Sequence, residues 1–318
     1  MIYVITTSSH AYTHSRRECG NLVQLMTYDY VFSRHFLLLG TWIFTDLDRL
    51  GFWELELAAK VYMELKAAGV RVLNNPARIC QRFSLLRCLK NKGLNSYSVW
   101  RVEDDEMPDR YPVFLRTQSA HRGVLDELIY DAETLKDKID KACNQGYPTK
   151  EIMIVEYCAQ PTDTGIFRKL AAYRIGDNIV PAVCAHQKHW VAKYGETGIA
   201  GQALYDEEYR LIKDNPYADE ILNIFNIGHI EYGRIDFGLV ENKIETYEIN
   251  TNPNVAFTRK HPYPIRIESG NLSKKLYENA MAEINTPDTK QKIEIISVRS
   301  AFKDLIDSPP FTKHRRIP

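Results

Sequence analysis

The sequence has no long apolar run and no excess of charge of one sign. None of its hydrophobic stretches approaches the roughly 20 residues that a membrane-spanning helix needs. Its 41 basic side chains balance 41 acidic ones, which gives a formal net charge of zero. Nucleic-acid and membrane surfaces depend on an excess of Lys and Arg over a whole face. We therefore expect neither partner, and a small-molecule or protein substrate is favoured.

Paired cysteines, internal repeats and a leader segment are missing as well. No low-complexity segment occurs, and no signal peptide precedes the first expected strand. No two of the six cysteines stand in a C-x-x-C spacing. These absences predict a cytoplasmic enzyme with reduced thiols, and they leave a homo-oligomer open. The cysteines are Cys19, Cys80, Cys88, Cys143, Cys158 and Cys184.

Apolar periodicity divides the 318 residues into four regions. Residues 1–93 alternate the strands "MIYVITT", "TWIFTDL" and "VRVLNNP" with the helices "WELELAAKVYMELKAA" and "RFSLLRCLKNKG", which is typical of an α/β lobe. Residues 94–160 contain the strand and loop "YPVFLRTQSAHRG", a helix with Asp131 as its N-cap, and the apolar strand "EIMIVEYCA". Residues 161–285 return to strands in "AAYRIGDNIVPAVCA" and "HWVAKYG", with "EEYRLIKDNPYADEILNIF" as a helix. Residues 286–318 are expected to form a peripheral or partly mobile tail.

The stretch "YGRIDFGLVENKIETYEINTN" near the end of the third region predicts a β-hairpin. If residues 241–243 form its loop, Asp236 faces Glu248 and Arg234 faces Asn250. Like charges directly opposite each other destabilise a strand pair by roughly 0.2–1 kcal/mol. An acid facing an acid therefore needs a chemical reason.

A divalent cation would turn this repulsion into attraction. Asp236, Glu248 and Asn250 offer the hard oxygen ligands that Mg²⁺ accepts. Arg234 lies on the same strand face and offers a planar fork to a phosphoryl or carboxylate oxygen. A solvated hairpin face without function is the alternative. Under the metal hypothesis, Glu248→Gln abolishes ATP turnover, and without metal it leaves stability unchanged or raises it.

The hairpin resembles the metal-binding strands of the ATP-grasp superfamily. Members bind MgATP between two α+β subdomains and hold the metals on paired strands that read approximately R-x-D-(x)n-E-x-N, which "GRIDFGL" and "YEINTNPN" match. The resemblance implies an α+β, ATP-grasp fold with an N-terminal α/β lobe, a small central lid subdomain and a C-terminal antiparallel-sheet subdomain. It also implies ATP with Mg²⁺, or Mn²⁺ in its place. Asp236, Glu248 and Asn250 would be the metal ligands, and Arg234 would stabilise charge on the transferring phosphoryl group.

Two further segments resemble nucleotide-binding parts of the family. "PVFLR" resembles a strand that ends in a nucleotide-binding lysine, with Arg116 in the lysine's place, and "SAHRG" would be the loop over the phosphates. A solvated Arg on an edge strand is the alternative. "IMIVEYCAQPTD" resembles the hinge that holds adenine. Glu156 would meet the adenine amino group, and Tyr157 and Ala159 would offer backbone groups.

Two more residues follow from the resemblance. Asp163 would take the ribose hydroxyls, although "PTDTG" also suits an Asx-turn. Lys193 in "HWVAKYG" matches a lysine that some members direct at the phosphates, with a solvated lysine as the alternative.

The implied activity is that of an ADP-forming carboxylate–amine ligase of the D-alanine–D-alanine ligase or glutathione synthetase type, acting through an acylphosphate. Its substrate would be a small molecule or peptide that bears a carboxylate. An ATP-grasp kinase that phosphorylates a hydroxyl group and a nucleotide-binding regulatory protein are the alternatives. Arg259, Lys260 and His261 suit an anionic substrate of either enzyme. His10 and His14, at i and i+4, form either a metal pair or part of a loop or helix start.

Overall fold

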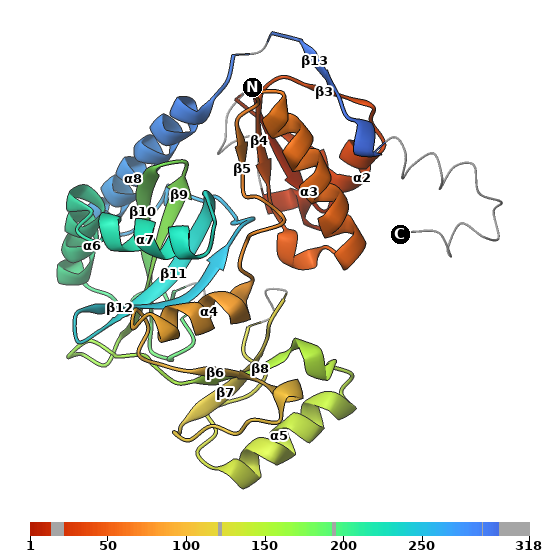
Figure 1. Ribbon diagram of the computed structural model, residues 1–318. Coiled ribbons are helices and arrows are strands. Elements are labelled where there is room, and N and C mark those ends of the chain that lie inside the picture. The colour runs from red at the N-terminus through yellow and green to blue at the C-terminus, as the bar shows by residue number, and fades with distance from the viewer. Residues whose placement is uncertain (14–21, 120–122, 193–194, 288, 299–318) are drawn as a thin grey trace.

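The computed structural model describes residues 1–13, 22–119, 123–192, 195–287 and 289–298. Four sheets lie in these residues, and with their helices they build three units: an N-terminal unit, a central unit and a C-terminal unit (Figure 1). The C-terminal unit contains the hairpin of the third expected region. The mixture of helices with separate parallel and antiparallel sheets confirms the expected α+β class.

A four-stranded parallel sheet in the order β2-β1-β4-β5 forms the core of the N-terminal unit. Its strands are β1 (Ile2–Thr6), β2 (Val23–Thr27), β4 (Thr41–Phe44) and β5 (Val72–Leu73), and its helical segments are η1 (Ser8–Thr13), α2 (Tyr28–Phe32), η3 (Leu47–Arg49) and α3 (Phe52–Ala67). Strand β1 is buried along its whole length, as parallel strands covered on both faces are. Helix α3 covers one face through Ala58, Val61 and Leu65. The opposite face carries Ile2 and Val4 and packs against the C-terminal unit.

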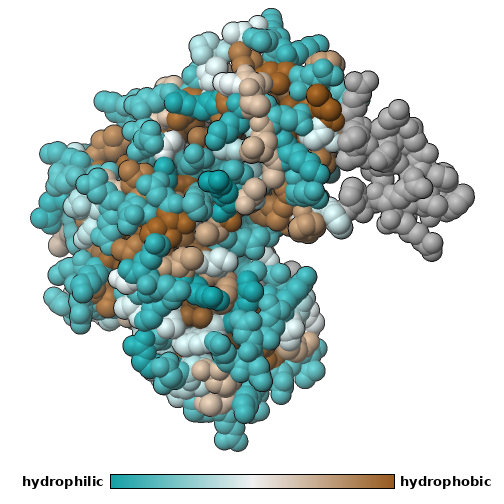
Figure 2. Space-filling view, in the orientation of Figure 1, coloured by the Kyte–Doolittle hydropathy of each residue, from teal (hydrophilic) through white to brown (hydrophobic). Residues whose placement is uncertain are grey.

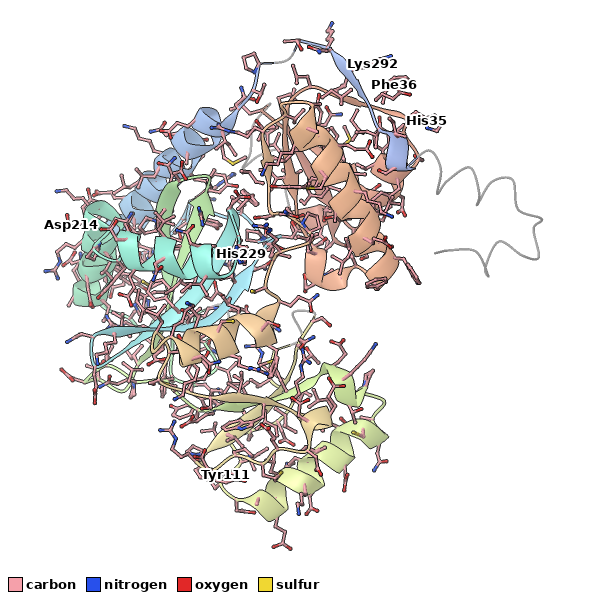
Figure 3. All side chains as sticks on the ribbon, viewed as in Figure 1. His35, Phe36, Tyr111, Asp214, His229 and Lys292 are labelled. Atoms are coloured by element: carbon pink, nitrogen blue, oxygen red, sulfur yellow. The ribbon has the colours of Figure 1, made fainter. Side chains whose placement is uncertain are left out.

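The C-terminal tail returns to the N-terminal unit. Strand β13 (Lys292–Glu294) pairs with β3 (Phe36–Leu38), and Figure 3 labels Phe36 and Lys292 at the outer edge of that unit. Ile295 and Val298 are fully buried in the core beneath α3. The expectation of a peripheral tail is therefore wrong for residues 292–298, because Ile293, Ile295 and Val298 of "IEIISV" are buried in this core. Residues 299–318 lie outside the described part of the chain.

The central unit is an antiparallel sheet in the order β6-β8-β7, covered by one long helix. Its elements are β6 (Val99–Arg101), η4 (Val102–Asp104), β7 (Val113–Thr117), α5 (Ala132–Asn144), η5 (Thr149–Glu151) and β8 (Ile152–Glu156). Asp131 caps α5 as expected, since its carboxylate accepts a hydrogen bond of 2.7 Å from the Thr134 N–H. Leu135 and Ala142 of α5 pack on Val113, Leu115 and Ile154 of the sheet.

Helix α4 (Arg82–Asn91) joins the central and C-terminal units (Figure 1). From the sequence, this helix is expected in the N-terminal lobe. Phe83 and Leu86 pack with the central sheet, while Leu85 and Leu89 pack with the C-terminal sheet. Apolar side chains on more than one face of the helix let it bridge the two units.

The C-terminal unit is an antiparallel sheet in the order β10-β9-β11-β12. Its strands are β9 (Phe167–Ile175), β10 (Asn178–Gln187), β11 (Tyr232–Val240) and β12 (Lys243–Asn250), and its helices are α6 (Gln202–Asp214), α7 (Ala218–Ile227) and α8 (Pro264–Ile284). Helix α7 packs on the face that carries Leu170 and Ile235. Helix α8 packs on the face that carries Tyr173 and Ile175, together with the N-terminal sheet.

Two expected elements of this unit differ in the structure. The stretch "EEYRLIKDNPYADEILNIF" forms two helices, because Asn215 adopts a left-handed conformation with φ 44° and Pro216 cannot continue the ladder of α6. The start of "HWVAKYG" forms bends at residues 189–191 where a strand was expected. Lys193 and Tyr194 lie outside the described residues.

The surface carries mixed polarity. Figure 2 shows hydrophilic residues over most of the visible face, with hydrophobic residues interspersed among them. No helix in the described residues is both long enough and apolar enough to span a bilayer.

Candidate active site

The hairpin of β11 and β12 brings the expected metal-site residues together. Arg234 lies opposite Asn250, and Asp236 lies opposite Glu248, as the sequence predicts. Along β11, Arg234 and Asp236 alternate with the fully buried Ile235. Because successive side chains of a strand point to opposite faces, the two polar groups share one face of the sheet.

The loop and the pairing that produce this register differ from the expected three-residue loop. The loop has two residues, Glu241 and Asn242, with φ of 50° and 63°, as a two-residue hairpin loop with left-handed residues requires. One extra residue, Tyr247, is inserted in β12 between the partners of Asp236 and Phe237, and this bulge restores the predicted pairing. Gly238 makes room for it, since a Cβ there would overlap the Tyr247 hydroxyl.

Cations neutralise Asp236, which is 2% exposed. The Lys169 ammonium of β9 donates to its Oδ2 over 2.9 Å, and the Arg234 Nε–H donates to its Oδ1 over 2.8 Å.

Two arginines hold the facing Glu248. Arg82 Nη2, from the first turn of α4, and Arg116 Nη2, from β7, donate to the same oxygen, Oε2, over 2.5 and 2.8 Å. Each acid of the hairpin therefore has its own cationic partners. The sequence-based prediction for Glu248→Gln in the absence of metal assumes an unpaired Glu248, whereas this carboxylate is ion-paired with two arginines.

The site has a surplus of positive charge. Four cationic groups contact two carboxylates, which leaves two positive charges unbalanced. Burial, followed by the neighbouring charge of Arg82, lowers the pKa of Arg116, whereas Asp236 raises the pKa of Arg234. Such a surplus suits an anion with several oxygens, such as a phosphate chain.

Sequence reasoning missed Arg82 and Lys169. Arg82 is the first residue of α4, where the helix dipole disfavours a cation, so its position was a usable signal of an anionic partner. Lys169 lies two residues from Ala171, which pairs with Asp236 across β9 and β11. Only the order of the strands brings this lysine to the site, and the sequence does not specify that order.

A large cavity adjoins these charges between the central and C-terminal sheets. It encloses about 1140 Å³ of empty space, part of it open to solvent. Arg116, Lys169, Asp236 and Glu248 line it, together with apolar side chains that include Val155. A mostly apolar cleft with a few converging charged groups is the usual form of a small-molecule site.

Aromatic side chains form part of the wall of this cavity. The Trp190 ring lies 4.9 Å from the Phe114 ring and 5.6 Å from the Tyr157 ring, measured between centroids. All three residues line the cavity. The ring planes meet at 54° and 85°, which are the tilted and edge-to-face arrangements that aromatic pairs prefer.

The expected adenine-binding segment also lines the cavity. Glu156, Tyr157 and Ala159 follow one another along its wall. The Glu156 carboxylate accepts hydrogen bonds from the Ser98 N–H and Arg110 Nη2 over 2.9 and 3.0 Å, so it already has partners. The Tyr157 N–H donates to a carbonyl of the loop before β7, and its own carbonyl is therefore the group it can offer to a ligand.

Solved structures share the fold of this chain. No protein-family model and no curated protein sequence matches the chain. The D-alanine–D-alanine ligase of Bacillus anthracis complexed with ATP is similar, with a TM-score of 0.50 and 14% identity over 89% of this chain and 96% of that one. The D-alanine–D-alanine ligase of Coxiella burnetii gives a TM-score of 0.50 and 15% identity over 89% of this chain and 94% of that one. The chain has the ATP-grasp fold.

Within this ATP-grasp fold, two predicted nucleotide contacts lie away from the cavity or outside the description. Asp163 is exposed in a turn and lines a neighbouring hollow, which shares Gln160, Arg168 and Leu239 with the large cavity. Its ribose contact stays a prediction. Lys193 is outside the described residues, as are residues 120–122 of the expected phosphate loop.

His10 belongs to a buried network of the N-terminal unit. Its Nδ1 lies 2.7 Å from Asp46 Oδ1. Burial raises the pKa of Asp46, but hydrogen bonds from His10 and Thr6 outweigh it and lower the pKa overall. The Asn252 amide donates to Thr6 Oγ1 over 2.9 Å and ties the segment after β12 to this network. The helix-start alternative fits His10, and His14 lies outside the described residues.

The donors of the hairpin fit Mg²⁺ in kind. Asp236, Glu248 and Asn250 present carboxylate and amide oxygens on paired strands, which are the ligands a hard cation prefers. The Asn252 N–H donates to Asn250 Oδ1 over 2.8 Å and fixes that amide. In the described part of the chain, no three His, Cys, Asp or Glu side chains gather as a metal site. The set therefore needs the Asn250 amide as its third donor, and its metal role stays a prediction.

Proposed function

We propose that this chain is an ATP-dependent, ADP-forming carboxylate–amine ligase that acts through an acylphosphate. One observation carries the proposal: an ATP-grasp fold pairs Asp236 with Glu248 and Arg234 with Asn250 at the charged end of a large cavity. The D-alanine–D-alanine ligases that share the fold support the class of reaction. The substrate would be a small molecule or peptide that bears a carboxylate.

The cavity would hold ATP with its phosphates at the charged end. Adenine would lie against the wall of Phe114, Tyr157 and Trp190, with the Tyr157 carbonyl and the Ala159 N–H at its edge. In our proposal Glu156 holds this edge in place through its bonds to Ser98 and Arg110, Asp163 reaches the ribose, and Lys193 reaches the phosphates.

The cations of the site would neutralise the transferring phosphoryl group. Arg116 and Lys169 would exchange part of their contact with the hairpin acids for phosphate oxygens, and Arg234 would hold the phosphoryl group or the intermediate. Asp236, Glu248 and Asn250 would hold Mg²⁺, which when bound supplies further neutralisation of phosphate charge.

The reaction has two balanced steps. An oxygen of the donor carboxylate attacks the γ-phosphorus, the bond to ADP breaks, and an acylphosphate forms. The amine nitrogen of the acceptor then attacks the acyl carbon, inorganic phosphate leaves, and the nitrogen loses a proton as the amide forms. Fixed cations in a cavity lined by apolar side chains stabilise the charge that develops in both steps.

The test is a screen of amino acids and short peptides with ATP and Mg²⁺, read as ADP formation and followed by mass spectrometry of the product. We expect a product with the mass of donor plus acceptor minus water. Oxygen-18 in the donor carboxylate should appear in the released phosphate. A phosphorylated product without condensation would identify a kinase, and ADP formation that survives Asp236→Asn would contradict the site.

A further inference from the structure

Arg82 contacts the candidate site from behind the wall of the large cavity. Its side chain is 8% exposed, and within the described part of the chain it is not among the residues that line the cavity, whereas Arg116 and Glu248 are. Its Nη2 donates to Glu248 Oε2, the oxygen that also accepts from Arg116 Nη2. Arg82 therefore reaches the site through Glu248, and not through the cavity in which we place the nucleotide.

The second Nη atom of Arg82 holds the backbone that follows Arg116. Nη1 donates to the carbonyl oxygens of Thr117 and Gln118 over 2.8 and 3.0 Å. Thr117 is the last residue of β7 and comes directly after Arg116. One planar guanidinium therefore joins the backbone beside Arg116 to the carboxylate that Arg116 contacts.

Glu151 of η5 holds the same backbone from within the central unit. The Gln118 N–H donates to Glu151 O over 2.7 Å, and the Ser119 N–H donates to Glu151 Oε2 over 3.3 Å. The Ser119 hydroxyl donates to the same carboxylate oxygen. Glu151 thus keeps this backbone on the central unit, whereas Arg82 connects it to α4 and, through Glu248, to β12.

The geometry of Arg82 matters more than its charge. It lies in the first turn of α4, where the helix dipole disfavours a cation, and its Nε–H has no acceptor among the described residues. The side chain accepts these two costs and places its Nη atoms on three oxygens. A lysine would keep the charge, but its single nitrogen cannot reproduce a planar fork.

We propose that Arg82 is a positioning residue, which sets Arg116 and Glu248 relative to each other and does not contact the nucleotide. Its role in ligation rests on the proposed function. When Arg116 gives part of its contact to a phosphate oxygen, Arg82 keeps Glu248 on the sheet face that it shares with Asp236, where the metal would be held. Groups that orient a metal ligand typically contribute about 10- to 100-fold in metal affinity.

ATP binding in Mg²⁺ and in chelator separates positioning from direct contact. The full chain and its Arg82→Lys variant are titrated with ATP in a calorimeter in both buffers. For Arg82→Lys we expect the affinity to fall about tenfold or more in Mg²⁺ and less than about threefold in chelator, because the charge remains and the orientation of Glu248 is lost. Arg82→Gln should also reduce the ratio of the two affinities. A purely structural role would lower stability and leave this ratio unchanged.

Arg87→Lys is the matched control, since Arg87 lies on the exposed face of the same helix, and it should change neither affinity. An equal fall in the two buffers for Arg82→Lys would mean that Arg82 contacts the phosphates directly. Unchanged affinities would mean that the planar fork is not needed. Either result overturns the assignment.

Hydrogen exchange of the nucleotide-free chain tests the Arg82 contacts without the proposed function. In Arg82→Lys the amides of Gln118 and Ser119 should exchange about tenfold or more faster than in the wild type. Slow exchange in β8 would show that the central sheet is folded. Unchanged exchange at Gln118 overturns the assignment even if ATP binds. A wild-type chain that binds no ATP would overturn the proposed function, and exchange would then decide on the Arg82 contacts alone.

Discussion

At the scale of single residues, the site is governed by ion pairs across subdomains. Glu248 of the C-terminal sheet is held by Arg82 of α4 and Arg116 of the central sheet. Without any ligand, this carboxylate connects β12 to α4 and β7 through hydrogen bonds. Bringing a second anion, such as a phosphate, to the same arginines must compete with Glu248, so substrate binding and the local structure are coupled.

The ion pairs of Glu248 predict the sign of a mutation. Glu248→Gln should lower the free energy of unfolding in chelator by about 1–3 kcal/mol, because two partly buried arginines lose their carboxylate. Glu241→Gln, at the exposed turn of the same hairpin, should change it by less than about 0.5 kcal/mol. Urea denaturation of both variants in chelator measures the difference. An unchanged or raised stability in Glu248→Gln would show that the arginine contacts contribute nothing.

A second residue predicts a dependence on pH. His186 of β10 is buried, and burial followed by the charges of Arg266 and Arg168 lowers its pKa from 6.5 to about 4. Protonation therefore favours the unfolded chain. The stability that this group contributes is complete above the unfolded pKa of 6.5 and is lost as the pH falls through 4.

His186→Gln isolates this contribution. Between about pH 7 and about pH 5, protonation of His186 should lower the free energy of unfolding of the wild type by up to about 2 kcal/mol. The variant has no such group and should not show this decrease. The difference in unfolding free energy between the wild type and His186→Gln should therefore decrease as the pH falls. Chemical denaturation at each pH measures it. His189→Gln, at an exposed site two residues past the end of β10, is the control for loss of a surface histidine. A gap that stays constant would mean that His186 is protonated equally in both states.

At the scale of elements, the hairpin was predictable because its pattern is local. Alternation of apolar and polar residues gave both strands and the facing pairs of Asp236 and Glu248. The shorter loop and the Tyr247 bulge were not predictable, since a three-residue loop without a bulge leads to the same pairs. The expected loop was one residue too long and the bulge was not expected, and these two errors offset each other. The facing pairs were therefore predicted correctly.

Elements whose packing depends on distant partners were harder to predict. The spacing of apolar residues in α4 indicated a helix. The position of α4 between two units, however, depends on apolar partners far along the chain, such as Phe225 and Val155. Arg82 and Lys169 reach the site through such long-range packing. The break between α6 and α7 was visible in the sequence, because Asn215 and Pro216 are residues that end helices.

The strand β13 and the residues after it give a prediction at this scale. Ile295 is fully buried in the N-terminal core, and its backbone N–H donates to His35 O over 2.8 Å, whereas the neighbouring Ile296 is 68% exposed. Ile295→Ala should cost about 2–5 kcal/mol of unfolding free energy, and Ile296→Ala should cost less than about 0.5 kcal/mol. Guanidinium denaturation compares the pair directly. Equal effects would show that the tail does not contribute to this core.

At the scale of the whole molecule, the three units are joined in different ways. The N-terminal sheet packs its apolar face on the C-terminal unit, and Asn252 adds hydrogen bonds to Thr6 and Thr13 across that contact. The central unit joins the others through α4 and the arginine contacts to Glu248. The large cavity lies beside this second junction, so a ligand there would bridge the central and C-terminal units.

The central claim is that this cavity binds ATP through a metal held by the hairpin. Without metal, ATP would meet the cations of the site together with the carboxylates of Asp236 and Glu248, which repel its phosphates. With Mg²⁺ the carboxylates become ligands, and the repulsion is removed.

Calorimetric titration of the full chain with ATP, once in Mg²⁺ and once in chelator, tests this claim most directly. We expect ATP to bind at least about tenfold more tightly in Mg²⁺, which is a difference of about 1.4 kcal/mol or more. Equal affinity in the two buffers, or no ATP binding in either, would contradict the account.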